Sequence, residues 1–152
     1  MSSITKSVEV EVPVQAAYDQ WTQFEDFPRF MEGVEEVVQV DDRHLRWNVR
    51  IAGAERTFDA EITEQHPDER VAWKATGETM HAGVVTFHRL DDGRTKVTLQ
   101  MDLEPSDWVE RVGDALGIVD ARIQGDLDRF KEFIEERHVP TGAWRGEIDR
   151  PR

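Results

Sequence analysis

Residues 106–138 read SDWVERVGDALGIVDARIQGDLDRFKEFIEERH, and apolar side chains recur in this stretch at spacings of three and four. The recurring positions are Val109, Val112, Leu116, Val119, Ile123, Leu127, Phe130 and Ile134. This spacing is typical of an amphipathic helix with one apolar stripe. Ser106, which follows Pro105, is a suitable N-cap. The sequence therefore predicts a long C-terminal helix of about 50 Å.

Most of the chain before this helix alternates between apolar and polar residues, as β-strands with one covered face do. The predicted strands are residues 4–12, 34–40, 45–51, 56–63, 71–75, 83–90 and 96–103. Turn sequences such as Asp91-Asp92-Gly93 separate the later strands, and short links join antiparallel neighbours. Between the first two strands, apolar residues at helical spacing predict two short helices, over residues 14–24 and 24–31.

The strands and the long helix together predict an α+β domain. In this fold class a seven-stranded curved antiparallel sheet wraps around the C-terminal helix and encloses an apolar cavity. The apolar parity of the strands includes Leu45, Trp47, Val49, Ile51, Phe58, Ala60, Ile62, Val71, Trp73, Val85, Phe87, Val97, Leu99 and Met101. We expect one domain over residues 1–138 and an irregular tail over 139–152, in which Trp144 and Ile148 can fold back onto the body.

The composition excludes several classes of function. The chain has 152 residues, a formal net charge of −13 and no cysteine. The negative charge opposes the phosphate backbone, so nucleic-acid binding is not expected. The apolar runs are too short to span a bilayer, and the first residues lack the apolar core of a secretory signal. We therefore expect a cytoplasmic protein without stable membrane insertion. The oligomeric state stays open.

The order of predicted elements resembles the helix-grip fold of the START-like superfamily, and the local sequence resembles its polyketide cyclase/dehydrase branch. The resemblance covers about residues 4–138. The matching stretches are VEVPVQAAYDQW (10–21), FPRFM (27–31), VTF (85–87), LDDGRT (90–95) and LDRFKEFI (127–134). This superfamily includes aromatic cyclases, lipid and quinone binders, plant hormone binders and chaperone cofactors, so the resemblance implies the fold and leaves the function open.

The resemblance also implies where a cyclase would carry its reactive groups. Aromatic cyclases of this type are expected to place an arginine and a serine on the fourth strand and a tyrosine beside the second. The corresponding positions here are Ile62, Ala60 and Val34. None of these side chains can donate a hydrogen bond or polarise a ketone. This departure from the pattern argues against aromatic cyclase activity.

Two residues are candidates for catalytic chemistry. Arg56 shares the apolar parity of its strand and can hold a carboxylate, a phosphate or an enolate near one end of the cavity. The alternative is a strand-end arginine that reaches solvent. His81 lies in a glycine-bracketed loop, residues 77–83, where it can serve as a general base at the cavity rim. The alternative is a solvated loop histidine.

The predicted ligand-binding residues combine the inward strand positions, the first short helix and the long helix. They are Tyr18, Trp47, Val49, Arg56, Phe58, Ala60, Trp73, His81, Phe87, Leu99, Val112 and Leu116. Trp47 and Trp73 can stack on a ring-bearing ligand or simply fill the core. No pair of histidines has metal-binding spacing, and there is no dinucleotide fingerprint. We therefore expect no metal and no cofactor.

Three functions remain open at this stage. The nearly apolar inner face favours binding, and possible transfer, of a hydrophobic small molecule such as a lipid, quinone or polyketide. The first alternative is a cyclase or dehydratase that acts on a polyketide, with His81 as base and Arg56 as enolate stabiliser. The second alternative is a regulatory domain that contacts a protein partner through its acidic outer face.

Overall fold

The computed structural model describes residues 2–51, 54–76, 81–103, 115–146 and 148. Within these ranges, the side chains at 2, 51, 54, 56, 81, 103 and 115–120 are outside the description. The predicted helix start at Ser106, together with Val109 and Val112, therefore lies outside the described residues.

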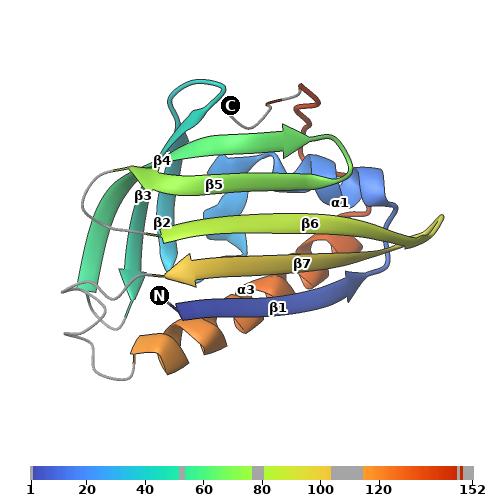
Figure 1. The fold of residues 1–152 in the computed structure, drawn as a ribbon. Helices are drawn as coiled ribbons and strands as arrows, with labels where there is room; N and C mark the ends of the chain where they lie inside the picture. Colours follow the sequence, from blue (N-terminus) through green and yellow to red (C-terminus); the bar gives the residue numbers. More distant parts are fainter. Residues whose placement is uncertain (1, 52–53, 77–80, 104–114, 147, 149–152) are drawn as a thin grey trace.

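The seven-stranded antiparallel sheet and the C-terminal helix are confirmed. The elements in chain order are β1 (Ser2–Val10), α1 (Val14–Trp21), the 3₁₀ helix η1 (Phe24–Arg29), β2 (Val34–Gln39), β3 (His44–Ile51), β4 (Ala54–His66), β5 (Arg70–Thr76), β6 (His81–Asp91), β7 (Arg94–Leu103) and α3 (Ala115–Arg137). The strand order across the sheet is β1-β7-β6-β5-β4-β3-β2. Figure 1 shows α1 and α3 behind the strands that face the viewer, so both helices cover the same face of the curved sheet.

The covered face is the apolar one that the alternation predicts. Most of its described apolar strand residues are buried, and Val8, Val34, Phe58 and Met101 are half-buried. The helix contributes its apolar stripe to the same core, with Ile123, Leu127, Phe130 and Ile134 all buried. Burial of apolar surface in this layer is the main favourable contribution to folding. The helix ends where His138 takes a φ of 62° and its N–H donates to the Ile134 carbonyl at 2.8 Å.

Aromatic rings link the two short helices to the sheet and to α3. The Trp21 ring lies 5.1 Å from the Phe130 ring and 5.3 Å from the Phe27 ring, measured between centroids. Phe27 in turn contacts Trp47 at 5.5 Å, and Trp47 stacks on Phe58 at 6.0 Å. One continuous row of rings therefore runs from α1 across η1 to strands β3 and β4.

Strand β4 contains an irregularity that the alternation does not predict. Its pairing with β5 shifts register between Ile62 and Glu64, so that Gln65 lies opposite Val71. Such a bulge inserts one extra residue into a strand and resets its side-chain parity. Without the bulge, alternation from Ala60 and Ile62 would place Gln65 on the outer face. Because of the bulge, Gln65 is buried on the inner face instead.

The loop position expected for His81 is wrong. His81 is the first residue of β6 and lies opposite Leu103 of β7. The strand starts earlier than predicted because β7, which extends to Leu103, supplies a pairing partner for each β6 residue from 81 to 89. Strand β1, in contrast, ends at Val10, two residues before the predicted end.

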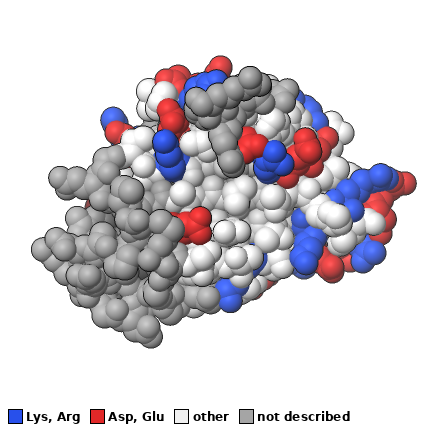
Figure 2. Space-filling model, in the orientation of Figure 1, with Lys and Arg blue, Asp and Glu red and all other residues white. Residues whose placement is uncertain are grey.

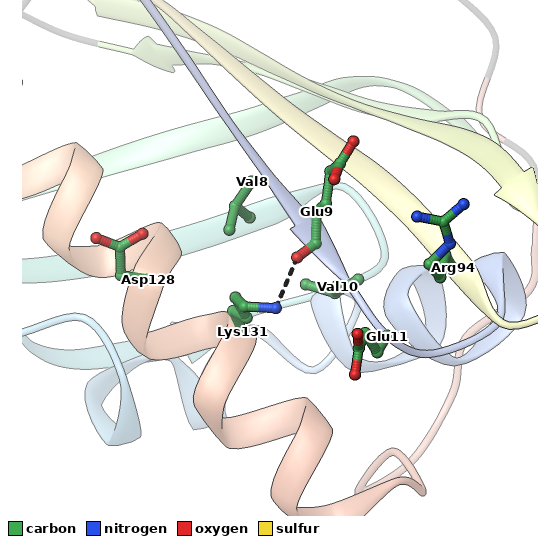
Figure 3. A pocket seen from close by; sticks show the side chains of 7 residues that line it. All are labelled: Val8, Glu9, Val10, Glu11, Arg94, Asp128 and Lys131. Atoms are coloured by element: carbon green, nitrogen blue, oxygen red, sulfur yellow. Dashed lines mark hydrogen bonds between the residues drawn. The ribbon is translucent and has the colours of Figure 1, made fainter.

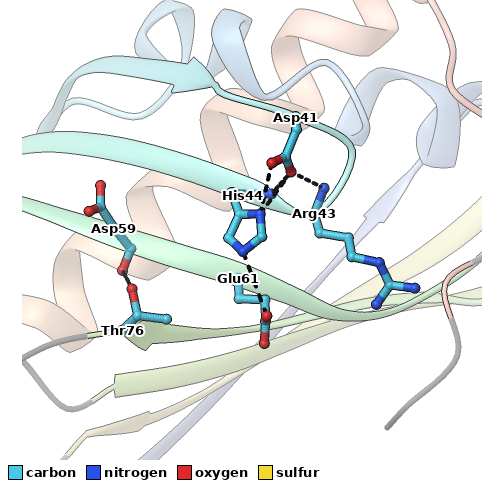
Figure 4. A network of polar contacts seen from close by, with 6 residues as sticks. All are labelled: Asp41, Arg43, His44, Asp59, Glu61 and Thr76. Carbon is cyan, nitrogen blue, oxygen red and sulfur yellow. Dashed lines mark hydrogen bonds and ion pairs between the residues drawn. The ribbon is translucent and has the colours of Figure 1, made fainter.

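The outer face of β2, β3 and β4 carries cross-strand ion pairs. Arg50 bridges Glu35 and Glu55, with Nε and Nη2 at 2.9 Å and 2.8 Å from the two carboxylates. Figure 4 shows the neighbouring network, in which the Asp41 carboxylate accepts hydrogen bonds from the His44 ring and backbone. These groups are exposed, so the acidic positions of β4 form a solvated, ion-paired face.

The other outer strands look different. Figure 2 shows few charged side chains over the middle of β6 and β7. The outward residues paired there are Val84 with Gln100 and Thr86 with Thr98. The acidic character that the composition suggests is therefore not spread evenly over the outer face.

Candidate ligand-binding site

Eight of the twelve predicted site residues have described side chains, and they lie on the covered face. They are Tyr18, Trp47, Val49, Phe58, Ala60, Trp73, Phe87 and Leu99. Val112 is outside the described residues, and the side chains of Arg56, His81 and Leu116 are outside the description as well. The binding role of all twelve residues stays a prediction.

The backbone register brings Arg56 and His81 to the same end of the sheet. Arg56 of β4 lies opposite Val49 of β3. Three residues further along β4, Asp59 pairs with Thr76, the last residue of β5. His81 lies one residue before Ala82, which forms the last β5–β6 pair toward this end. Both residues therefore lie next to the end of β5, at the end of the sheet remote from Tyr18 and Gln65.

Burial on the inner face decreases from one end of the sheet to the other. Near α1, Tyr18, Ile62 and Val85 are 0% exposed, and Trp21 is 1% exposed. Toward the opposite end, Trp47, Val49 and Trp73 reach 8%, and Phe58 and Met101 are half-buried. The end near α1 is thus mostly a filled core, although Phe87 there is 7% exposed and Val8 is half-buried, while the other end retains accessible apolar surface at Phe58 and Met101.

Gly83 shapes the accessible end. It pairs with Trp73 on one side and with Met101 on the other. A Cβ placed on Gly83 would lie 2.5 Å from Cζ2 of Trp73 and 2.9 Å from the Met101 sulfur. The Trp73 indole therefore lies across the glycine, against the sheet, instead of standing upright between the sheet and α3. A missing side chain in a strand commonly marks such a close approach.

At the filled end, Tyr18 and Gln65 are buried polar residues. Within the described part of the chain, the Tyr18 hydroxyl and the Gln65 amide nitrogen have no hydrogen-bond partner of normal geometry. Burial raises the pKa of Tyr18 to about 12, and the nearby Gln65 amide and the Arg145 guanidinium partly offset this rise. The phenol is therefore a neutral donor at physiological pH and not a base.

Tyr18 offers a direct test of this burial because it is the only tyrosine in the chain. Its folded-state pKa of about 12 exceeds the ordinary 10. The contribution of the neutral Tyr18 to the free energy of unfolding is therefore fully present below pH 10 and decreases as the pH rises from 10 to 12. We expect the phenolate absorbance to appear near pH 12 in the folded protein and near pH 10 in denaturant. A folded-state midpoint near 10 would contradict this burial.

The C-terminal tail closes the filled end. The Ile148 backbone exchanges hydrogen bonds of 2.7 and 2.9 Å with Gln65, and its side chain is 3% exposed. Arg145 binds the Asp19 carboxylate at 2.5 Å and the Asp68 carboxylate at 2.8 Å, and its guanidinium lies 5.7 Å from the Tyr18 ring centroid. The tail therefore ties α1 to the turn between β4 and β5.

Sequence reasoning missed two polar residues of the inner parity. Gln65 faces inward because of the bulge, for which the sequence carries no glycine or proline signal. Lys6 on β1 lies opposite Leu99, shares the parity of Ile4 and Val8, and is half-buried. The predicted strand 4–12 already places Lys6 on this parity, so the alternation alone could have identified it.

A separate hollow of about 390 Å³ lies at the β1 edge of the sheet, between β1 and α3 (Figure 3). Its lining residues are Val8, Glu9, Val10, Glu11, Arg94, Asp128 and Lys131. Lys131 donates a hydrogen bond of 3.0 Å to the Glu9 carbonyl, and the Glu11 N–H donates to Glu135 at 2.7 Å. Helix α3 thus satisfies two backbone groups near the C-terminal end of β1, at an edge where unpaired groups are open to pairing with another chain. The hollow is charged and does not resemble the apolar site predicted from sequence.

The family of the chain follows from comparison with known proteins. A family model described as polyketide cyclase / dehydrase and lipid transport matches residues 10–132. This match spans most of the chain, so the chain belongs to that family, as the resemblance to the polyketide cyclase/dehydrase branch predicts. Among the described residues, no helix is both long and apolar enough to cross a bilayer.

Individual proteins are also similar to this chain. An uncharacterised 17.2 kDa protein of Streptomyces lincolnensis, named for the melC2-rnhH intergenic region, is 58% identical over 149 residues, which cover 97% of this chain and 99% of that protein. The crystal structure of the Zhui aromatase/cyclase from Streptomyces sp. R1128 has a TM-score of 0.75 at 16% identity and covers 94% of this chain and 99% of that one. A START superfamily protein from Mycobacterium smegmatis has a TM-score of 0.66 at 15% identity, covering 84% and 97%. These structural likenesses show the fold.

Proposed function

We propose that the chain binds one hydrophobic small molecule between the inner face of the sheet and α3. The observation that carries this proposal is the accessible apolar surface around Phe58 and Met101 on the inner face of the sheet. Binding sites for small molecules are commonly apolar clefts with few polar groups. The family description, which includes lipid transport, supports the same function.

The residues at the cyclase positions favour binding over catalysis. Ile62 and Ala60 are fully buried on the inner face of β4, and Val34 is half-buried at the start of β2. Their side chains can exclude water from a ligand, but they offer no donor to a carbonyl group. A ligand held by these residues would leave chemically unchanged.

A cyclase or dehydratase activity has one observation in its favour. The register places Arg56 and His81 at the same end of the sheet, next to the accessible surface. If the chain turns over a polyketide, Arg56→Ala and His81→Ala should each lower the rate strongly. Unchanged turnover in both variants would exclude these two roles.

The binding proposal is tested by native mass spectrometry of protein purified without detergent, followed by solvent extraction. We expect one organic molecule per chain, or saturable uptake of an apolar fluorescent dye if the molecule is lost. Absence of both a bound molecule and saturable dye binding would contradict the proposal.

Phe58 and Thr57 provide a matched pair of variants for the same experiment. They are neighbours on β4, with Phe58 half-buried on the inner face and Thr57 exposed on the outer face. Phe58→Asp introduces a carboxylate into an apolar lining, where desolvation is costly, so we expect loss of dye binding. Thr57→Asp adds the same charge in solvent and should leave binding intact. Equal binding by two folded variants would contradict an interior site.

A further inference from the structure

Trp47 carries a polar atom whose position is not explained by the fold. The residue lies on the inner face of β3, is 8% exposed, and stacks on Phe58 with an interplanar angle of 11°. Its other ring contact is with Phe27 at a centroid distance of 5.5 Å. The indole Nε1 is buried and has no hydrogen-bond partner among the residues that the structure describes.

An unpaired indole N–H at this position is costly. Most buried polar groups are hydrogen-bonded, and a buried donor without a partner loses its hydrogen bond to water without a replacement. A phenylalanine would retain aromatic contacts with Phe58 and Phe27 without this cost. The presence of a donor-only group here indicates a hydrogen bond that forms when something else occupies the site.

Trp47 differs in location from Trp21, the other described tryptophan whose buried indole nitrogen has no partner. Trp21 Nε1 is also unpaired, but Trp21 is enclosed by four phenylalanine rings at the filled end. Trp47 instead lies where the row of rings meets the accessible surface, directly against half-buried Phe58. A ligand that covers Phe58 therefore lies beside the Trp47 ring.

We propose that Trp47 determines ligand specificity by donating its indole N–H to an oxygen acceptor of the bound molecule. This inference rests on the binding function proposed above. It specifies an uncharged ligand with a flat apolar part that covers Phe58 and a carbonyl or hydroxyl oxygen at its edge. A plain hydrocarbon of the same shape leaves the indole unpaired and binds more weakly.

Two probes of nearly identical shape test this specificity. 2-Acetylnaphthalene carries a carbonyl oxygen where 2-isopropenylnaphthalene carries a CH₂ group. We expect the folded wild-type protein to bind the ketone about tenfold more tightly, which corresponds to about 1.4 kcal/mol. Trp47→Phe should bind the two probes within about twofold, because the donor is gone while a ring remains. Trp144→Phe, the same change in the C-terminal tail outside the proposed site, should keep the preference for the ketone.

The outcomes separate this inference from the binding function itself. If neither probe binds the wild-type protein, the binding function is contradicted and the specificity with it. If both probes bind equally well, or if Trp47→Phe keeps the preference for the ketone, binding stands and the role of Trp47 is overturned.

A measurement on the wild-type protein covers the case in which Trp47→Phe fails to fold. The indole N–H resonance of Trp47 should move downfield when the ketone binds and should not do so with the alkene. Equal movement with both probes would overturn the proposed hydrogen bond.

Discussion

Trp21→Ala is expected to lower the free energy of unfolding by about 3–5 kcal/mol, because removal of a buried aromatic side chain leaves a cavity that its neighbours only partly fill. Trp21 is 1% exposed and contacts Phe27, Phe30, Phe87 and Phe130, so α1, η1, β6 and α3 all lose a contact at once. Denaturation with urea, followed by circular dichroism, measures the loss.

Val40→Ala serves as the control for this variant. Val40 is 60% exposed beyond the end of β2, so its truncation should change the free energy of unfolding by less than about 0.5 kcal/mol. A similar loss for both variants, or a small loss for Trp21→Ala, would show that the aromatic row is not the core of the domain.

Arg145→Ala is expected to lower the free energy of unfolding by about 2–3 kcal/mol, because it leaves the buried Asp19 carboxylate without its partner. The Asp19 side chain is 8% exposed, and burial raises its pKa even though the Arg145 hydrogen bond lowers it. The cost of desolvating Asp19 thus exceeds the attraction that the arginine supplies. Loss of the arginine alone leaves that cost unrelieved.

Substitution of the partner residue, Asp19, should lower the free energy of unfolding much less. Asp19→Asn removes the buried charge, while Arg145 keeps its contact of 2.8 Å with Asp68. We expect a loss below about 1 kcal/mol, and Asp19→Asn combined with Arg145→Ala should recover part of the loss caused by Arg145→Ala. Arg46→Ala, which breaks an exposed pair with Asp59, should cost less than about 1 kcal/mol. Equal losses for Arg145→Ala and Asp19→Asn would contradict this asymmetry.

The sequence predicts the fold well because the fold depends on periodicity. Strict alternation on six strands and a helical stripe from Ile123 to Ile134 place apolar residues on one side, and the structure buries them there. Element ends are less predictable, because they depend on pairing partners. His81 belongs to β6 because β7 reaches Leu103, and no property of residues 77–83 indicates this.

The polar details of the site depend on contacts that periodicity does not specify. The bulge that brings Gln65 inward occurs in a stretch of ordinary polar residues, and the clamp of Arg145 on Asp19 joins residues 126 apart in the chain. The unpaired Trp47 donor is visible only once the neighbours of its Nε1 are known. Sequence reasoning therefore identified Trp47 as a lining residue but not as a donor.

Ligand binding inside the sheet can be observed in a titration of the wild-type protein with 2-acetylnaphthalene, followed through the indole N–H resonances of its tryptophans. We expect the Trp47 and Trp73 resonances to shift together and to saturate at one equivalent, while Trp144 in the tail stays unchanged. Shifts confined to Trp144, or shifts that never saturate, would contradict a binding site between the sheet and α3.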